Sequence, residues 1–357
     1  MNAESRNALA TRTVLLLLCF AASAIFAALI PLLWHDKLYI DGLTIVHTPP
    51  LLEAFGSSFE SSAFFLNPIL DLLRGMGVGL DNYGLLYDND LLIVNNTFGA
   101  LFCIGIAILA VRWRIQVNLK NILIFSVFVV LFAPFYFCIT KELVLFAATL
   151  VVLSCYRAGW FGLSTMVTFY VILLILCGIY FRVYYLAFAI LLVFNFLFWR
   201  KRKWLSFFYV IAAVMLVVLH DHLPLDLLNK GRATYLENVS ASRIEYYFDD
   251  GSGAGFLANR ALTFCMLLLP INLLAVSVSY APFIVAQAFL SLKMLRQLMR
   301  PGRDISVLAA SAVMAFTMVA ALFEPDFGSY FRHKVGILLF MLLLIADFEW
   351  CKQRGQA

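Results

Sequence analysis

The sequence is divided into long apolar runs separated by short polar segments. Hydrophobic residues make up 63% of the 357-residue chain and charged residues only 13%, which lies outside the range of water-soluble domains. Runs of 15 to 30 residues suit helices that cross a hydrocarbon layer about 30 Å thick. The sequence therefore predicts an all-α, polytopic integral membrane protein, folded as a single transmembrane domain over residues 1–357.

The expected number of transmembrane helices is about ten. The apolar runs cover residues 13–33, 91–111, 121–139, 142–156, 161–180, 183–199, 204–219, 261–291, 306–323 and 334–347. The first run follows Arg6 and Arg12, as a secretory signal would. Its length and the many runs after it favour an uncleaved first helix.

The basic residues near the helix ends predict the orientation, because lysine and arginine stay on the cytoplasmic side. With the N-terminus inside, 16 of the 26 Lys and Arg residues fall on the inner side, including the cluster 200–203. The same orientation places 17 of the 21 acids outside. We therefore expect both termini in the cytoplasm. Cations on the outer side run against this charge rule, so they are the residues most informative about function.

Several kinds of function find no support in the sequence. The seven cysteines lie almost entirely within apolar runs without a CxxC pair, as expected of packing residues. Neither a GxxxxGK[ST] nor a GxGxxG motif is present. His220 and His222 are too few for a metal site. We expect no metal, no cofactor and no nucleic-acid partner, since the net charge of +5 follows the membrane topology.

Two outer segments are long enough to form structure of their own. They span about residues 34–90 and 220–260. Apolar residues at helical spacing over 62–73 predict a short helix along the membrane surface. The second segment is rich in Tyr, Asp and Arg and ends in a glycine-rich stretch, 251–255, that is typical of a mobile loop over a site.

Two outer cations lie directly at helix ends. Lys141 and Glu142 occupy the turn between two apolar runs, and Arg182 lies in an equally short turn. A charge so close to hydrocarbon costs several kcal/mol unless an anionic partner balances it. Lys141 could extend to the interface or pair with Glu142, and Arg182 could anchor a helix end among aromatic rings. Their coincidence on the outer side favours a ligand site.

A third charged group lies between the last two runs. It is the segment 324–334, EPDFGSYFRHK, in which His333 and Lys334 could also be interfacial anchors. Together, these outer residues predict one site. It would combine groups that transfer a proton with groups that bind a diphosphate or a sugar. The proton-transfer candidates are Glu142, Glu324, Asp326 and His333. The substrate-binding candidates are Lys141, Arg182, Tyr184, Arg232, Arg243, Arg260, Tyr330, Arg332 and Lys334.

These residue types suit transfer from a lipid-linked sugar diphosphate. Guanidinium groups bind phosphate in a bidentate manner, and ammonium and imidazole add positive charge. They would stabilise the departing diphosphate, while a carboxylate or His333 accepts the proton of the acceptor hydroxyl. Tyrosine rings can stack on sugars. The outer tyrosines are Tyr180, Tyr184, Tyr185, Tyr246, Tyr247 and Tyr330.

Three segments of the chain resemble bacterial polysaccharide polymerases of the Wzy type. They are TKEL at 140–143, RVY at 182–184 and EPDFGSYFRH at 324–333. The resemblance implies polymerisation of undecaprenyl-diphosphate-linked repeat units of O-antigen, capsule or exopolysaccharide, at the periplasmic face of the bacterial inner membrane. It also implies a flippase and a chain-length regulator as partners, beside membrane lipid. We expect a GT-C-like helical bundle with two longer periplasmic loops. The second outer segment, of about 40 residues, is shorter than the large outer loop of many members of this family and of the related ligases. The choice between a polymerase and a ligase therefore stays open.

Two alternatives stay open. A GT-C transferase that adds single sugars from a polyprenyl monophosphate would use acids of the first outer segment. Asp36, Asp41 and Glu53 lie there, although without a DxD or ExD motif. A transporter would show mid-membrane charges or an internal repeat. Pro134 and Pro270 interrupt helices, but no repeat is visible.

Overall fold

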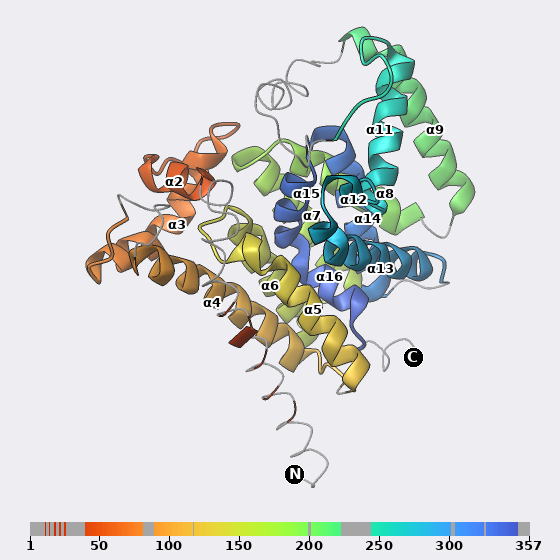
Figure 1. Cartoon of the computed structure of the whole chain (residues 1–357). Coiled ribbons are helices and arrows are strands. Elements are labelled where there is room, and N and C mark those ends of the chain that lie inside the picture. The colour runs from red at the N-terminus through yellow and green to blue at the C-terminus, as the bar shows by residue number, and fades with distance from the viewer. Residues whose placement is uncertain are drawn as a thin grey trace. The chain divides into compact units, whose positions relative to one another are not determined.

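The computed structural model describes most of the chain after residue 39. The described ranges are 40–80, 89–116, 118–198, 201–222, 244–300, 304–324 and 326–348, with six single helical residues between 11 and 25. Within these ranges the regular elements are helices, apart from one isolated bridge between Ile115 and Phe348. The expected all-α class is confirmed (Figure 1). Most of the predicted helix 13–33 lies outside the described residues.

The α-helices follow one another with mostly short connections. They are α2 (Ile40–His47), α3 (Ser58–Gly75), α4 (Asn89–Arg112), α5 (Leu119–Tyr136), α6 (Glu142–Ala158), α7 (Leu163–Tyr180), α8 (Tyr184–Phe198), α9 (Arg202–Val218), α11 (Gly253–Leu268), α12 (Leu273–Val276), α13 (Ala281–Leu298), α14 (Ile305–Phe323), α15 (Phe327–His333) and α16 (Leu338–Ile345). Three 3₁₀ turns accompany them, His220–His222, Val278–Tyr280 and Lys334–Ile337.

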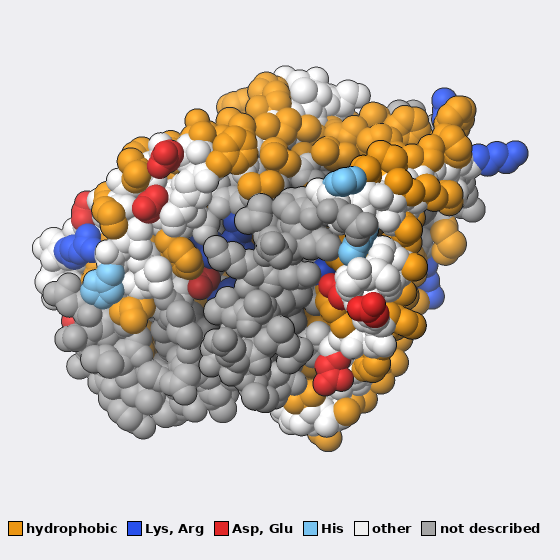
Figure 2. All heavy atoms as spheres, turned by 90° about the horizontal axis from the view of Figure 1, so that it is seen from above, with side chains coloured by type: hydrophobic (Ala, Val, Ile, Leu, Met, Phe, Trp, Pro, Cys, Tyr) orange, Lys and Arg blue, Asp and Glu red, His pale blue; other side chains and the backbone are white. Residues whose placement is uncertain are grey.

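Within the described ranges, six helical segments are long and apolar enough to cross a membrane. They are Asp90–Arg112, Leu119–Tyr136, Leu163–Tyr180, Val278–Leu298, Ile305–Phe323 and Phe327–Ile345. Three shorter apolar helices are Tyr184–Phe198, Lys203–Val218 and Gly253–Leu268. Apolar side chains cover much of the described surface in Figure 2, as expected of a chain whose solvent is partly lipid. The chain is a multi-pass membrane protein.

The chain divides into two compact units. The first unit comprises Met1–Leu186 and Val335–Ala357, and the second unit comprises Ala187–Lys334. In the first unit, α4 packs against α5 and α6, α6 packs against α7, and α16 contacts α5 and α6. In the second unit, α14 packs against α11 and α13, and α9 packs against α11.

Small residues make α14 the buried centre of the second unit. Most of its residues are buried, and its alanines let neighbouring helices approach closely in an apolar solvent. In the first unit, α16 is the corresponding buried helix, because all eight of its residues are buried.

The predicted helix 261–291 is wrong as one element. α11 ends at Leu268, and α13 begins only at Ala281, with α12 and a 3₁₀ turn between them. Pro270 directly follows the C-cap Leu269 and cannot donate a backbone hydrogen bond, which ends the helix there. Figure 1 shows that α11 and α13 run in different directions.

The last predicted helix begins earlier than expected. Residues 327–333 form α15 instead of a loop, and the apolar segment that could span a membrane starts at Phe327 rather than at residue 334. The cause is Asp326, whose carboxylate accepts hydrogen bonds from the N–H and the hydroxyl of Ser329, both at 2.9 Å. Such an N-cap satisfies backbone donors of the first turn.

The glycine-rich stretch 251–255 is also more ordered than predicted. Gly253, Ala254 and Gly255 form the first turn of α11, and Ser252 caps it by accepting the N–H of Gly255 at 3.1 Å. The predicted surface helix 62–73 is confirmed as a helix and is longer, because α3 spans Ser58–Gly75.

Candidate functional site

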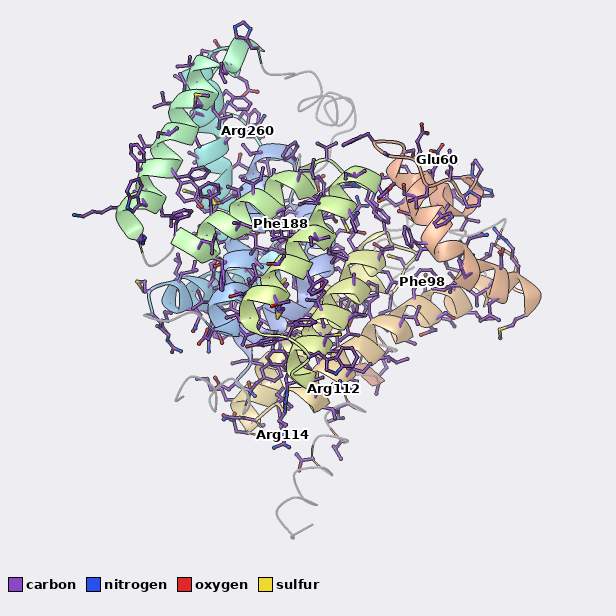
Figure 3. All side chains as sticks on the ribbon, turned by 180° about the vertical axis from the view of Figure 1, so that it is seen from behind. Glu60, Phe98, Arg112, Arg114, Phe188 and Arg260 are labelled. Carbon is purple, nitrogen blue, oxygen red and sulfur yellow. The ribbon has the colours of Figure 1, made fainter. Side chains whose placement is uncertain are left out.

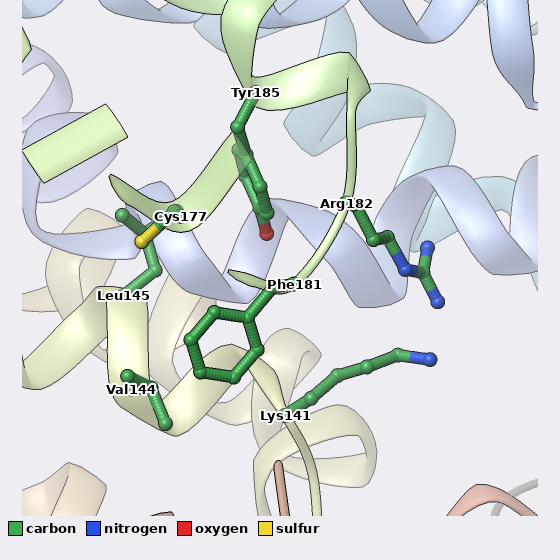
Figure 4. Close-up of a pocket in the computed structure, with 7 residues that line it drawn as sticks. All are labelled: Lys141, Val144, Leu145, Cys177, Phe181, Arg182 and Tyr185. Atoms are coloured by element: carbon green, nitrogen blue, oxygen red, sulfur yellow. The ribbon is translucent and has the colours of Figure 1, made fainter. Parts of the chain in front are cut away.

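Two cations of the first unit line one pocket. Lys141 directly precedes α6, and Arg182 lies in the turn between α7 and α8, as the sequence predicts. Figure 4 shows their charged ends extending toward the same side, with the Tyr185 ring between α7 and the pocket. The lining residues are Lys141, Val144, Leu145, Cys177, Phe181, Arg182 and Tyr185.

The pocket is small and largely apolar apart from its cations. Its empty space of about 260 Å³ is mostly the open mouth, and the enclosed part has room only for a water-sized group. An anionic group such as a phosphate would therefore meet the two cations at the mouth of the pocket. Its apolar walls strengthen the attraction between such an anion and the cations.

Lys141 is buried against the first outer segment. Its Nζ lies 3.4 Å from the Oδ2 atom of Asp41 in α2 and 4.4 Å from the ring centroid of Phe59 in α3. The side chain of Lys141 is only 5% exposed. The sequence offered Glu142 as the partner of Lys141, whereas the structure identifies Asp41 as an anion that pairs with it.

Glu142 shapes the start of α6. It is buried, its backbone N–H donates to the Thr140 hydroxyl at 3.4 Å, and the Thr140 hydroxyl donates back to the Glu142 carboxylate. This reciprocal pair resembles a capping arrangement and explains how the short turn after α5 enters the next helix.

Arg182 packs on the tyrosine that follows it. Its Nη1 atom donates to the Tyr184 hydroxyl at 3.4 Å, and the guanidinium carbon lies 5.5 Å from the centroid of the Tyr184 ring. Tyr184 is buried, whereas Arg182 is half-buried. The predicted aromatic anchor for Arg182 is therefore present, and the arginine still reaches the pocket.

The first outer segment packs beside the same turn, which the sequence did not reveal. The rings of Phe65 in α3 and Phe181 are 5.5 Å apart, and the Phe55 N–H donates to the Ile179 carbonyl at 2.6 Å. Apolar residues at helical spacing indicated α3, but nothing in its pattern distinguished a membrane-facing side from one that contacts the pocket.

The second unit contains a buried acid–histidine pair. The Nδ1 atom of His333 at the end of α15 lies 2.6 Å from Oε1 of Glu324 at the end of α14. An ionised carboxylate only accepts hydrogen bonds, so an ionised Glu324 accepts the Nδ1 proton of His333. Such a contact fixes the orientation of the imidazole ring.

Other predicted residues of the 324–334 segment contact protein groups. Asp326 is the N-cap of α15, and Arg332 is half-buried on the same helix. The buried Tyr330 hydroxyl lies 3.1 Å from the hydroxyl of Thr317, and the buried Lys334 donates to Gln287. In this conformation Tyr330 and Lys334 belong to the packed interior of the second unit.

Arg260 in α11 is held between aromatic rings. Its guanidinium carbon lies 4.6 Å from the Phe256 ring and 4.8 Å from the Tyr246 ring, and its Nη2 atom is 3.9 Å from the Asp250 carboxylate. Figure 3 labels its place on the helix. The predicted ligands Arg232 and Arg243 lie outside the described residues.

The structure thus groups the predicted residues into two sets. Lys141, Glu142, Arg182 and Tyr184 belong to the first unit, and Arg260 with the 324–334 segment belongs to the second. Within the described ranges, no three His, Cys, Asp or Glu side chains are placed to hold a metal ion. Whether both sets lie on one face of the membrane stays a prediction.

Comparisons with protein-family models, with curated proteins and with solved structures found no match for this chain. The class that the fold defines is an all-helical, multi-pass membrane protein.

Proposed function

We propose that the chain is a membrane glycosyltransferase that polymerises oligosaccharide repeat units linked to undecaprenyl diphosphate. The observation that carries the proposal is the pocket shared by Lys141 and Arg182 at the ends of apolar helices. A lipid-linked diphosphate presents its charge at this depth, next to the hydrocarbon layer. Two cations at the mouth of the pocket suit one phosphate of that group.

The proposed reaction breaks the bond between the anomeric carbon of the donor sugar and the diphosphate oxygen. The acceptor hydroxyl forms the new bond and loses its proton to a base, and the lipid diphosphate leaves with the electron pair. Lys141 and Arg182 would stabilise the charge that develops on the leaving group. Among the proton-transfer candidates, Glu142 belongs to the same unit as the two cations, whereas the pair of His333 and Glu324 belongs to the second unit.

The proposal includes a location and partners. The chain would have about ten transmembrane helices in a GT-C-like bundle, with both termini in the cytoplasm and the pocket on the periplasmic side of a bacterial inner membrane. A flippase would deliver the lipid-linked repeat units, and a chain-length regulator would limit the product of surface polysaccharide biosynthesis.

A second candidate function is supported by Asp41. A GT-C transferase that uses a polyprenyl monophosphate is expected to employ an acid of the first outer segment, and Asp41 of this segment contacts Lys141. The two functions differ in donor and product, because this transferase would add one sugar whereas the polymerase would transfer a whole glycan.

The decisive experiment compares surface glycans with and without the gene. Loss of a polymerase leaves single repeat units in place of a ladder on a gel, whereas loss of an earlier transferase removes the glycan. Arg182→Ala should reproduce the deletion at normal protein level. Arg74→Ala is the matched control, because Arg74 is exposed on α3 and pairs locally with Asp71. A full ladder with Arg182→Ala would overturn the site, and complete loss of glycan on deletion would overturn the polymerase.

A further inference from the structure

A single buried asparagine holds the segment that precedes α11. The Oδ1 atom of Asn259 accepts the N–H groups of Tyr247 and Phe248, at 3.1 and 3.0 Å. Its Nδ2 atom donates to the Phe248 carbonyl at 2.9 Å and to the Asp250 carboxylate at 3.1 Å. One side chain therefore fixes the backbone of Tyr247 and Phe248 and the carboxylate of Asp250, using both ends of its amide group.

Other groups hold the same segment beside α11. The ring of His220 contacts the Asp250 carbonyl through Nε2 at 3.2 Å, and the Arg260 guanidinium lies near the Asp250 carboxylate. A Cβ atom on Gly255 would lie 2.0 Å from the Asp249 carbonyl oxygen, so glycine permits this close approach. The segment is thus tied to α11 by side chains and by direct backbone packing.

This rigid backbone presents two aromatic rings to the outside. Tyr247 is 62% exposed and Phe248 is 53% exposed. Asp249 follows them and is exposed as well, with its Oδ1 atom accepting the Gly251 N–H at 3.0 Å. Two large aromatic rings that neighbour each other on a fixed surface segment are available to contact a ligand.

We propose that Tyr247, Phe248 and Asp249 form a subsite for an uncharged sugar ring of the glycan. The apolar face of a sugar stacks on an aromatic ring, and a carboxylate accepts hydrogen bonds from its hydroxyls. A platform that is already rigid loses little conformational entropy when it binds. The choice of glycan as ligand rests on the proposed function.

The neighbouring charges favour a sugar over a membrane surface. Aromatic residues that anchor a protein in the lipid headgroups are usually accompanied by Lys or Arg, which the phosphates attract. Here the residue after the rings is the exposed Asp249, while Asp250 pairs with Arg260. Acids repel anionic headgroups but accept hydrogen bonds from the neutral hydroxyls of a sugar.

Binding of a lipid-free oligosaccharide to the full-length protein in nanodiscs tests the subsite. The probe is the repeat-unit oligosaccharide released from the host's surface glycan by mild acid, and saturation-transfer NMR reports its affinity. Replacing both rings, Tyr247→Ala with Phe248→Ala, should weaken binding about tenfold. Tyr247→Trp should retain it, because indole also stacks. Phe207→Ala is the control, since Phe207 is an exposed ring of the apolar helix α9.

Unchanged affinity in the double variant would overturn the subsite, and so would an equal loss in the Phe207→Ala control. The outcome is separable from that of the proposed function. If the glycan ladder persists in Lys141→Ala with Arg182→Ala, the polymerase proposal fails. The oligosaccharide titration of Tyr247 and Phe248 variants still decides the subsite independently.

Discussion

The Nζ atom of Lys334 lies 2.6 Å from the side-chain carbonyl oxygen of Gln287, and both side chains are buried. Among the described residues, Lys334 forms no ion pair with a carboxylate; its Nζ atom lies 4.2 Å from the centroid of the Tyr330 ring and 5.9 Å from that of the Phe331 ring. A lysine with 0% exposure in an apolar segment is costly and is usually retained for a reason. Gln287 also donates to Ser291 at 3.2 Å, and Ser291 donates to the Leu268 carbonyl at 2.8 Å.

This network joins α15 to the end of α11, where the chain breaks before α13. The Tyr330 hydroxyl donates to the Leu267 carbonyl at 3.4 Å, so two carbonyls near the C-terminus of α11 receive side-chain donors. Helix C-termini leave such carbonyls without intrahelical partners and carry partial negative charge. The buried network satisfies them in the interior of the second unit.

We expect Gln287→Leu to destabilise the protein more than Lys334→Met. The first change leaves the buried Lys334 amino group without its acceptor and should cost about 2 kcal/mol. The second removes the charge, and Gln287 keeps Ser291 as a partner, so the cost should be about 1 kcal/mol. Thermal unfolding in detergent micelles measures both. The reverse order would show that the charge of Lys334 itself stabilises the fold.

Asp41 should compete with an anion for Lys141. Asp41→Asn removes the negative charge beside the pocket, and we expect about threefold tighter binding of inorganic pyrophosphate. Lys141→Ala should weaken this binding about tenfold. Calorimetric titration of the purified protein measures both changes. Asp71→Asn is the control, because Asp71 is an exposed acid of α3 that pairs with Arg74. Weaker binding with Asp41→Asn would contradict a competing role.

His333 should depend on Glu324 for its orientation. Glu324→Gln replaces the acceptor of the Nδ1 proton by an amide that can flip, and activity should fall about 10²-fold through the turnover rate. His333→Ala should lower it at least as much. The assay follows glycan elongation with a lipid-linked donor. A Glu324→Gln variant with full turnover would show that the carboxylate does not position the histidine.

Asp326 can be assigned to the helix cap or to the chemistry by one pair of substitutions. Asn caps a helix about as well as Asp, so Asp326→Asn should preserve both stability and activity if the cap is its role. Asp326→Ala should cost about 1 kcal/mol of stability. Unfolding temperature and glycan elongation are measured together. Loss of activity in a stable Asp326→Asn protein would identify a carboxylate that takes part in the reaction.

Local features of the chain predicted much of the helical framework. Most predicted helix ends agree with the structure within a few residues; the turn around Arg182 does so closely, since α7 ends at Tyr180 and α8 begins at Tyr184. The main error in helix number was at Pro270, which the sequence shows inside one apolar run. Because the residues on both sides are apolar, their composition did not reveal that the helix ends there. The early start of α15 was missed because the Asp326 cap stabilises a segment that looks polar.

The sequence by itself determined the class of the protein and the position of Lys141 and Arg182 at helix ends, whereas Lys334 lies inside the apolar segment Phe327–Ile345. Apolar length and the cost of placing charge in lipid are local properties, and they follow from the order of residues alone. Only the tertiary structure decided which side chains pair with these charged groups. Asp41 reaches Lys141, Gln287 reaches Lys334, and Asn259 holds Tyr247 and Phe248. Such partners depend on how helices pack, and packing in an apolar solvent leaves no periodic signal in the sequence.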